Sequence, residues 1–304
     1  LTQILVICLG LAGIMLIFTS CYGGAEPGIL SCIQREDTFT ITSDMRYDET
    51  PENTAIISEA FMFQRAMRIN FAFLMGNMIA GHQVMEYTED EELDFLQSYQ
   101  EFLQNELDLD YYPVAGNLDG PYYEQVFGDK NYAFDRFGIH FIVLSVDYDF
   151  TNELNWTSGF GPFNQTSFLR EQLEGYPDNL NFILIRNAIR PCRIVSDFPE
   201  EWDCNPLIEI LEQEFSETPI IVYQGEGTDF ENYEYGNVLY LRSPSLRDTN
   251  NPFILVEADF EQLVFYQVLK DEDDDYSELT EWFTYSMLDE EQSDEEEQDG
   301  EQEE

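Results

Sequence analysis

The chain has 304 residues, of which 43% are hydrophobic and 15% aromatic, and this is enough for one substantial hydrophobic core. Its 62 acidic and 13 basic residues give a formal net charge of −49, which excludes nucleic-acid binding through phosphate contacts as a general role. Such a charge instead favours solubility in salt, attraction of cations, or a basic protein partner.

The N-terminal segment 1–21 has the pattern of an export signal. Residues 4–18 are apolar and uncharged, and Thr19 and Ser20 lead into Cys21. This length suits a signal-peptide core of about 7–15 residues better than a membrane span of about 20. The small residues before Cys21 also resemble a bacterial lipoprotein processing site, so we expect Cys21 to carry a lipid. A single-pass anchor and an ordinary cleaved signal are the alternatives, and all three place the domain on the extracytoplasmic side.

The cysteines fit an exported protein. Of the five, Cys8 lies in the apolar leader and Cys21 at the expected lipidation site, which leaves Cys32, Cys192 and Cys204. Cys192 and Cys204 close a short loop and are the pair that we expect to form a disulfide. Their spacing resembles no zinc motif and no histidine accompanies them, so we expect no metal at this pair.

The globular domain is expected over 39–270, after a linker at 22–38 that is rich in glycine, proline and polar residues. Continuous apolar runs predict strands buried on both faces, and apolar residues at helical spacing predict helices. The elements expected in the first half are a strand at 39–42, a helix over 56–67, a strand at 71–75, a helix at 89–107 and a strand at 111–114.

The second half repeats this alternation and adds hairpins. The expected elements are two strands within 132–144, a short helix at 167–173, a strand at 182–185, a helix at 206–215, and strands at 220–223, 238–241, 253–256 and 263–268. Strand–helix alternation followed by antiparallel hairpins, occurring twice, predicts an α/β (α+β) fold. In this fold two mixed β-sheets pack as a sandwich flanked by helices.

The C-terminal segment 271–304 holds 18 acidic residues and no lysine or arginine. Such low-complexity acidity predicts a disordered tail. Its aromatic residues within 276–287 favour a brief helix that docks on the domain or on a partner. A solvated segment, a cation sink and an attractant for a basic partner are the alternative roles of the tail.

Four polar motifs each stand where an apolar strand gives way to a turn, the place where α/β enzymes put their chemistry. The motifs are Ser43-Asp44-Met45-Arg46, Gly76-Asn77 through Gly81, Gly116-Asn117-Leu118-Asp119 and Gly225-Glu226-Gly227-Thr228. In this order they resemble the calcineurin-like metallophosphoesterase family, which includes the purple acid phosphatases. The resemblance covers about residues 39–270, and its most specific piece is the run from Tyr112 to Asp119.

The resemblance implies a two-metal site, but most ligand positions of this chain depart from it. Asp44 and Asn117 match metal ligands of the family. Arg46 replaces a ligand histidine, and Asn77 replaces the aspartate that bridges both metals. The other vestigial positions carry Leu118 in place of a catalytic histidine, Asp119 beside it, Arg186 and Asn187 where a ligand histidine is expected, and Glu226 and Thr228 in place of two histidines.

These replacements argue against a metal pair. Two divalent cations about 3.5–4 Å apart need an anionic bridging ligand, which a neutral amide does not supply. Such sites also use imidazole ligands, and the chain has only two histidines. We expect His82 on a solvated loop and His140 in a structural role within a strand. We therefore expect no cofactor and no catalytic residue, with a single divalent cation at Asp44, Asp119 and Glu226 as the alternative.

The arginines at the site allow two interpretations. Guanidinium groups hold phosphate or carboxylate through paired hydrogen bonds, so Arg46, Arg186 and Arg190 could form a metal-free anion pocket. In the other interpretation Arg46 and Arg186 neutralise Asp44 and Asp119 in a collapsed site that needs no ligand.

Together these features predict an exported, membrane-anchored pseudoenzyme on a metallophosphoesterase scaffold. We expect a non-catalytic binding or assembly role, with a protein partner at a membrane surface. The alternative is a divergent phosphoesterase that hydrolyses phosphate esters with a rearranged mononuclear metal site.

Overall fold

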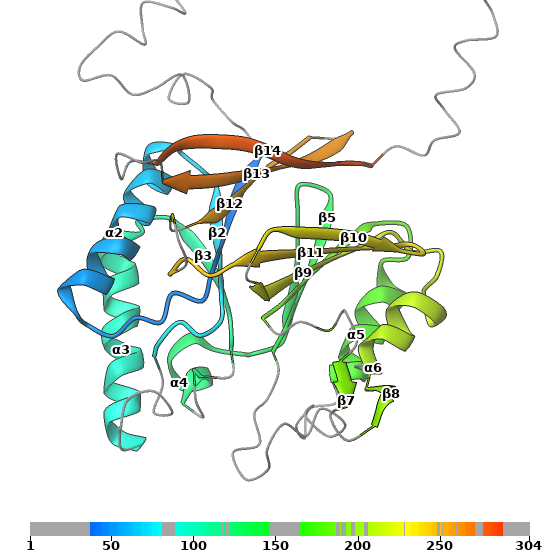
Figure 1. Ribbon diagram of the computed structural model, residues 1–304, viewed down its shortest axis with the longest axis horizontal. Helices are drawn as coiled ribbons and strands as arrows, with labels where there is room; N and C mark the ends of the chain where they lie inside the picture. Colours follow the sequence, from blue (N-terminus) through cyan, green and yellow to red (C-terminus); the bar gives the residue numbers. More distant parts are fainter. Residues whose placement is uncertain are drawn as a thin grey trace, which may run out of the picture.

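The fold is taken from a computed structural model (Figure 1). It describes residues 37–80, 89–116, 118–119, 122–145, 165–186, 189, 193–195, 198–203, 206–227, 229–247, 250, 252–259, 261–270 and 276–287. The expected export signal, Cys21, the linker up to residue 36 and the expected disulfide of Cys192 and Cys204 lie outside these residues and stay predictions. Within the described ranges no helix has both the length and the apolar character that a membrane crossing requires.

The first sheet has six strands and combines parallel with antiparallel pairing. Strands β1 and β2 and the edge strand β3 are parallel, and β12, β13 and β14 continue the sheet with antiparallel pairing. In spatial order the strands are β14 (Tyr276–Ser286), β13 (Gln262–Lys270), β12 (Phe253–Ala258), β1 (Thr38–Ser43), β2 (Phe71–Met75) and β3 (Asp110–Val114).

The second sheet also has six strands. Its four inner strands β11, β9, β6 and β5 are parallel, and the edge strands β10 and β4 are antiparallel to their neighbours. In spatial order the strands are β10 (Glu231–Tyr235), β11 (Val238–Pro244), β9 (Ile220–Gly227), β6 (Leu180–Ile185), β5 (Ile139–Leu144) and β4 (Tyr132–Arg136). The expected architecture of two mixed sheets is therefore confirmed.

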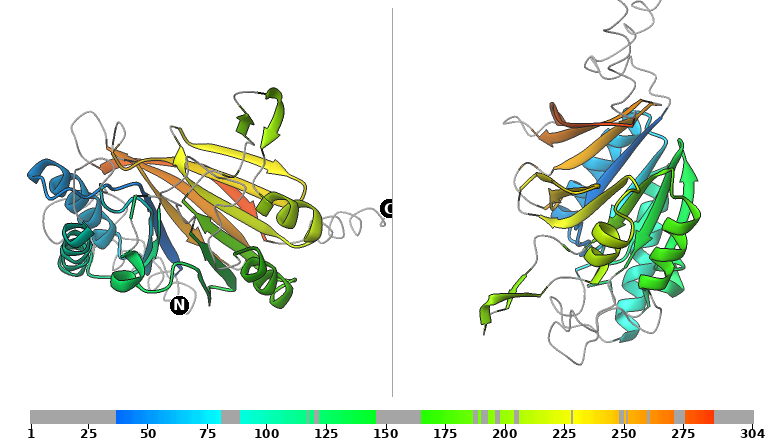
Figure 2. Two further views of the ribbon diagram at one scale, coloured as in Figure 1. Left: turned by 90° about the horizontal axis from the view of Figure 1, so that it is seen from below. Right: turned by 90° about the vertical axis from the view of Figure 1, so that its right-hand side faces the viewer.

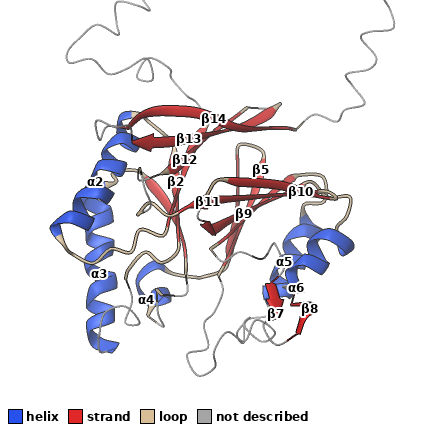
Figure 3. Ribbon diagram, in the orientation of Figure 1, coloured by secondary structure: helices blue, strands red, loops and turns tan. Residues whose placement is uncertain are grey.

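Helices cover the outer faces of both sheets (Figure 3). Helices α2 (Pro51–Ala66) and α3 (Glu89–Glu106) lie against the first sheet, and α4 (Tyr123–Phe127) packs beside α3. On the second sheet lie α5 (Gln165–Gly175) and α6 (Pro206–Glu209), which continues into the π-helical turn η2 (Ile210–Glu214). Figure 2 shows the hairpin of β7 (Arg193–Val195) and β8 (Phe198–Asp203) projecting from the sandwich.

Alternation along the strands explains why the strand sequences are apolar throughout. In β2 the side chains of Phe71 and Phe73 enter the core between the two sheets, while Ala72 and Leu74 face the helices. Each strand residue is therefore buried on one side or the other. Aromatic rings fill the space between the sheets: Phe39 stacks on Phe71 at 5.1 Å and meets Phe141 edge-on at 5.5 Å.

His140 has the structural role expected from its place in an apolar strand. Its ring is 2% exposed and stacks on Tyr176 with 3.6 Å between ring centroids. Nδ1 lies 2.7 Å from Asp135 Oδ1 and Nε2 lies 3.2 Å from Gln172 Oε1. The ring thus ties β4, β5 and α5 together. His82, by contrast, is outside the described residues.

The prediction of a disordered tail from residue 271, with a brief helix within 276–287, is wrong for residues 276–286. These residues form β14, which pairs with β13 over its whole length. Trp282, Phe283 and Tyr285 are partly buried against the core between the sheets. The pairing with β13 and the packing of the aromatic side chains outweigh the acidity of the segment. Strand formation depends on these contacts with distant residues, which the local composition does not reveal.

The helix expected at 206–215 is also only partly correct. Residues 206–209 form α6, and residues 210–214 form the wider π-helical turn η2. Ile210 and Leu211 are both buried in this turn against the second sheet. The apolar face that predicted the helix is therefore kept, although the winding differs.

If β14 is part of the folded domain, its two faces should respond differently to substitution. Phe283→Ala removes a partly buried ring that packs on the core, and we expect it to lower the free energy of unfolding by about 1–3 kcal/mol. Thr284→Ala alters an exposed side chain of the same strand and should change it by less than about 0.5 kcal/mol. Chemical denaturation measures both, and equal effects would show that β14 is not packed.

Candidate functional site

The site lies where the two sheets bring the carboxyl ends of their parallel strands together. In the first sheet the register aligns Ser43 with Met75, and Met75 with Val114, so the loops that follow these residues are neighbours. In the second sheet β6 ends at Ile185, directly before Arg186. Ligand sites of α/β folds occur at such strand ends. The motifs of the sequence therefore converge on one edge of the molecule.

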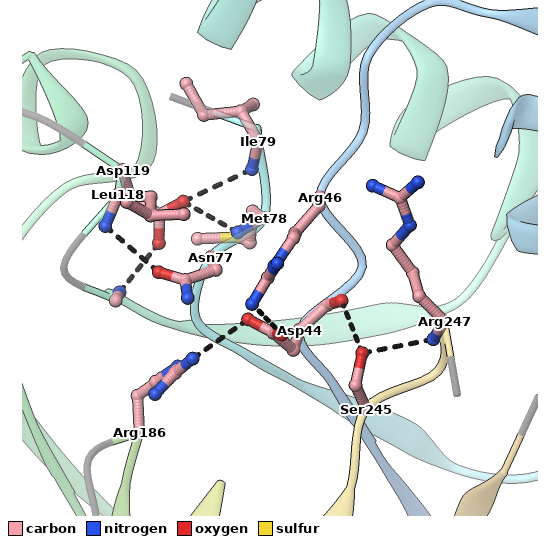
Figure 4. A network of polar contacts seen from close by, with 11 residues as sticks. Asp44, Arg46, Asn77, Met78, Ile79, Leu118, Asp119, Arg186, Ser245 and Arg247 are labelled. Carbon is pink, nitrogen blue, oxygen red and sulfur yellow. Dashed lines mark hydrogen bonds and ion pairs between the residues drawn. The ribbon is translucent and has the colours of Figure 1, made fainter. Parts of the chain in front are cut away.

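The centre of the site is the buried carboxylate of Asp44, which binds two arginines (Figure 4). Asp44 is 4% exposed. Arg186 donates from Nη2 to Oδ1 at 3.0 Å, and Arg46 forms an ion pair from Nη2 to Oδ2 at 2.8 Å. The side chain of Arg186 is almost fully buried, whereas that of Arg46 is 41% exposed. Each carboxylate oxygen thus carries one guanidinium group, and the three charges together are net positive.

Left-handed backbone conformations shape the loops of the site. Asp44, Arg46 and Asn77 have φ angles of 58°, 46° and 50°, a region that costs non-glycine residues about 1–3 kcal/mol. The backbone N–H of Arg46 donates to the carbonyl oxygen of Asn77 at 2.8 Å, which holds the two loops side by side. The left-handed conformations at Asp44 and Arg46 accompany the ion pair between their two side chains. Strain of this kind persists only where surrounding contacts enforce it.

Two glycines allow the close approach of the first-sheet loops. A Cβ atom at Gly76 would lie 2.3 Å from Cγ of Arg186 and 2.6 Å from Cα of Gly116. A Cβ atom at Gly116 would lie 2.2 Å from the backbone nitrogen of Asn77. All three distances are far below van der Waals contact, so only glycine fits at either position.

Asp119 holds the loops after β2 and β3 together. Its Oδ1 accepts from the N–H groups of Met78 and Ile79 at 2.6 and 3.3 Å, and its Oδ2 accepts from that of Gly116 at 2.7 Å. Burial raises the pKa of this carboxyl to about 7, although these hydrogen bonds and the charge of Arg186 act in the opposite direction. Beside it, Oδ1 of Asn77 accepts from the N–H of Leu118 at 3.0 Å.

This geometry corrects part of the collapsed-site interpretation. Arg46 and Arg186 both bind Asp44, as that interpretation expects. Asp119, however, is held by backbone N–H groups, and Arg186 acts on it only as a nearby charge that lowers its pKa. The sequence could not reveal this, because the donors are main-chain groups that every residue carries.

One contact of the site was missed at the sequence level. Ser245 donates its hydroxyl to the carbonyl oxygen of Asp44 at 3.1 Å and accepts from the N–H of Arg247 at 3.1 Å. The signal was its position directly after the apolar run of β11, whose parallel pairing with β9 brings it to the same edge. Four other expected residues and one side chain lie outside the described part of the chain: Asn117, Asn187, Arg190, Thr228 and the side chain of Glu226.

The described side chains of the site do not fit a divalent metal ion. Asp44 is already bound by two cations, and Asp119 directs both oxygens to backbone N–H groups. Across the described residues, no group of three or more His, Cys, Asp and Glu side chains is placed to hold a metal. The arrangement instead presents fixed positive charge, which suits an anion and repels a cation.

Known structures share the fold at low sequence identity. A dimetal phosphatase from Danio rerio matches with a TM-score of 0.59 and 12% identity, over 83% of this chain and 98% of that protein. GAP50, the anchor in the inner membrane complex of Plasmodium, matches with a TM-score of 0.50 and 14% identity, over 82% of this chain and 88% of that protein. No protein-family model and no curated protein sequence matches the chain. The expected calcineurin-like metallophosphoesterase fold is confirmed.

The raised pKa of Asp119 makes one contribution to stability depend on pH. In the unfolded chain this carboxyl ionises near its ordinary value of 3.8, and in the folded protein near 7. Folding therefore takes up a proton between these values, and the stability contributed below about pH 4 is lost as the pH rises to about 7. Asp119→Asn has no such titration, and it also places an amide NH₂ group against one of the N–H donors.

We therefore expect the free energy of unfolding of the wild type to fall by about 2–3 kcal/mol relative to Asp119→Asn between pH 5 and pH 8. Chemical denaturation of both proteins at each pH measures this difference, and the comparison cancels the general effect of the acidic surface. A difference in unfolding free energy that stays the same at every pH would contradict the raised pKa of Asp119.

Proposed function

We propose that this chain, which has the calcineurin-like metallophosphoesterase fold, is a pseudoenzyme: an exported, membrane-anchored protein with a non-catalytic binding or assembly role at a membrane surface. The observation that carries this proposal is the pair of guanidinium groups on Asp44, at the place where the resemblance puts a metal ligand. A shared fold leaves the chemistry open, because function depends on the residues of the site.

Electrostatics supports the loss of the metal pair. Arginine stays protonated at any physiological pH, so Arg46 and Arg186 bring permanent positive charge to the ligand Asp44. Two unit charges about 4 Å apart repel each other by roughly 4 kcal/mol at an effective dielectric constant of about 20, and a divalent cation doubles this for each arginine. Asn77, at the bridging position, is neutral and already accepts a hydrogen bond from Leu118. Among the described side chains, these charges disfavour a metal pair at Asp44 and Asn77.

The membrane location and the protein partner rest on other features. The apolar segment 4–18 followed by Cys21 supports export and anchoring. The fold shared with GAP50, an anchor in a membrane complex, is compatible with a role in assembly but supports it only by analogy. The acidic composition favours a basic protein over nucleic acid as the partner.

Metal analysis and an activity assay test the pseudoenzyme proposal. We expect protein purified from medium supplemented with iron, manganese and zinc to hold far less than one metal ion per chain. It should hydrolyse p-nitrophenyl phosphate and bis(p-nitrophenyl) phosphate no faster than buffer does. One bound metal per chain, with turnover that chelation removes and added metal restores, would instead support the divergent mononuclear phosphoesterase.

A second role of the same residues is favoured by the exposure of Arg46. Its side chain is 41% exposed, so N–H groups of the guanidinium that do not bind Asp44 can reach a phosphate or a carboxylate from solvent. Arg186, and Arg190 outside the described residues, would add positive charge to such an anion pocket.

Titration with inorganic phosphate tests this pocket. We expect binding in the millimolar range, weakened about threefold or more in Arg46→Gln, because one charge-assisted contact is lost. Arg68→Gln, on an exposed turn outside the site, is the matched control and should bind like the wild type. Absence of binding at about 10 mM phosphate would leave the collapsed, ligand-free site as the correct interpretation.

A further inference from the structure

The outer edge of the first sheet is formed by β14, the longest strand among the described residues. It has 11 residues and pairs with β13 on one side. Within the described part of the chain, no strand pairs with its other side. At about 3.3 Å per residue the strand is roughly 36 Å long. An exposed strand edge presents N–H and C=O groups that can pair with another extended chain.

The other three edges of the two six-stranded sheets are short or blocked. The edge strands β3, β4 and β10 have five residues each, and β3 contains Pro113, which lacks an N–H group. The stacking of Tyr112 on Phe134 also joins β3 to β4, at 4.1 Å between ring centroids. Soluble proteins protect their edges by prolines, charged side chains, β-bulges or short strands. Strand β14 is long and contains no proline, its pairing with β13 shifts register twice, and its exposed charge is the acidic Glu281. An acidic charge protects an edge against another acidic chain but not against a basic one.

Charge near β14 decides which kind of chain fits its edge. Glu281 is exposed on the strand itself, and exposed Glu234 of β10 lies close enough to raise the pKa of Tyr285. The sequence that follows, 288–304, adds 11 acidic residues and no basic one. A second copy of this chain would bring the same acidity and be repelled, because each chain carries a net charge of −49. A basic segment would be attracted.

We propose that β14 is the docking strand for a partner protein, which adds an extended segment rich in lysine or arginine to the outer edge of the first sheet. Main-chain hydrogen bonds to β14 supply the affinity, as in other cases of strand addition. Basic side chains of the partner opposite Glu281 supply the selectivity. This inference rests on the proposed binding role and names the surface and the chemistry of the partner.

Binding of a synthetic strand tests the proposal. The probe is a fluorescein-labelled peptide of eight alternating lysine and valine residues, titrated with the full chain at about 0.15 M salt and followed by fluorescence anisotropy. The control peptide has the same sequence with N-methyl groups on alternate residues, which keeps the charge and removes the N–H donors of one edge. We expect the N-methylated peptide to bind at least tenfold more weakly, because strand pairing needs these donors.

Variants of the chain test the position of the site. Glu281→Lys reverses the exposed charge on β14 and should weaken binding of the unmodified peptide about three- to tenfold. Glu101→Lys makes the same change on an exposed position of helix α3 and should leave binding close to that of the wild type. Because Glu281 is exposed, thermal denaturation should show that both variants fold like the wild type.

Three results would overturn the proposal. The first is no binding of the unmodified peptide up to about 1 mM. The second is equal binding of both peptides, or complete loss of binding when residues 289–304 are removed, either of which would assign the attraction to the acidic C-terminus. The third is self-association in analytical ultracentrifugation that Glu281→Lys abolishes, which would assign the edge to a second copy. None of these bears on the pseudoenzyme proposal, which metal analysis tests separately.

Discussion

The site depends on one buried carboxylate held between two arginines. Asp44 comes from the first sheet and Arg186 from the second, so their ion pair joins the two halves of the sandwich at the edge where the strands end. Burying these charges carries a desolvation penalty that is offset only when each charge keeps its partners. The second guanidinium, from Arg46, occupies the remaining carboxylate oxygen. This arrangement satisfies the carboxylate without a metal ion.

The surrounding loops enforce that geometry. Gly76 and Gly116 let the backbones approach more closely than any side chain allows, and Asp119 ties the two loops through backbone N–H groups. Left-handed conformations at Asp44, Arg46 and Asn77 bend the chain so that polar groups face one another. The glycines and turns that the resemblance assigns to a metal centre therefore serve here to support an ion pair.

The same scaffold separates its two proposed roles in space. The arginine site lies at the carboxyl ends of the parallel strands, whereas β14 lies at the edge of the first sheet, beyond β12 and β13. The site gives the reason to doubt catalysis, and the edge gives a surface for assembly. The net negative charge of the chain affects which partner binds at this edge, because it disfavours self-association and favours a basic partner.

Local patterns in the sequence were enough to predict two mixed sheets, the buried strands and the loops that carry Asp44, Asn77 and Asp119, because periodicity and strand-end motifs are properties of neighbouring residues. Contacts between distant residues needed the tertiary structure. The ion pair of Asp44 and Arg186 spans 142 positions, and the main-chain partners of Asp119 leave no trace in residue types. Strand β14 was predicted as a disordered tail, because its acids are visible locally while its pairing with β13 depends on the fold.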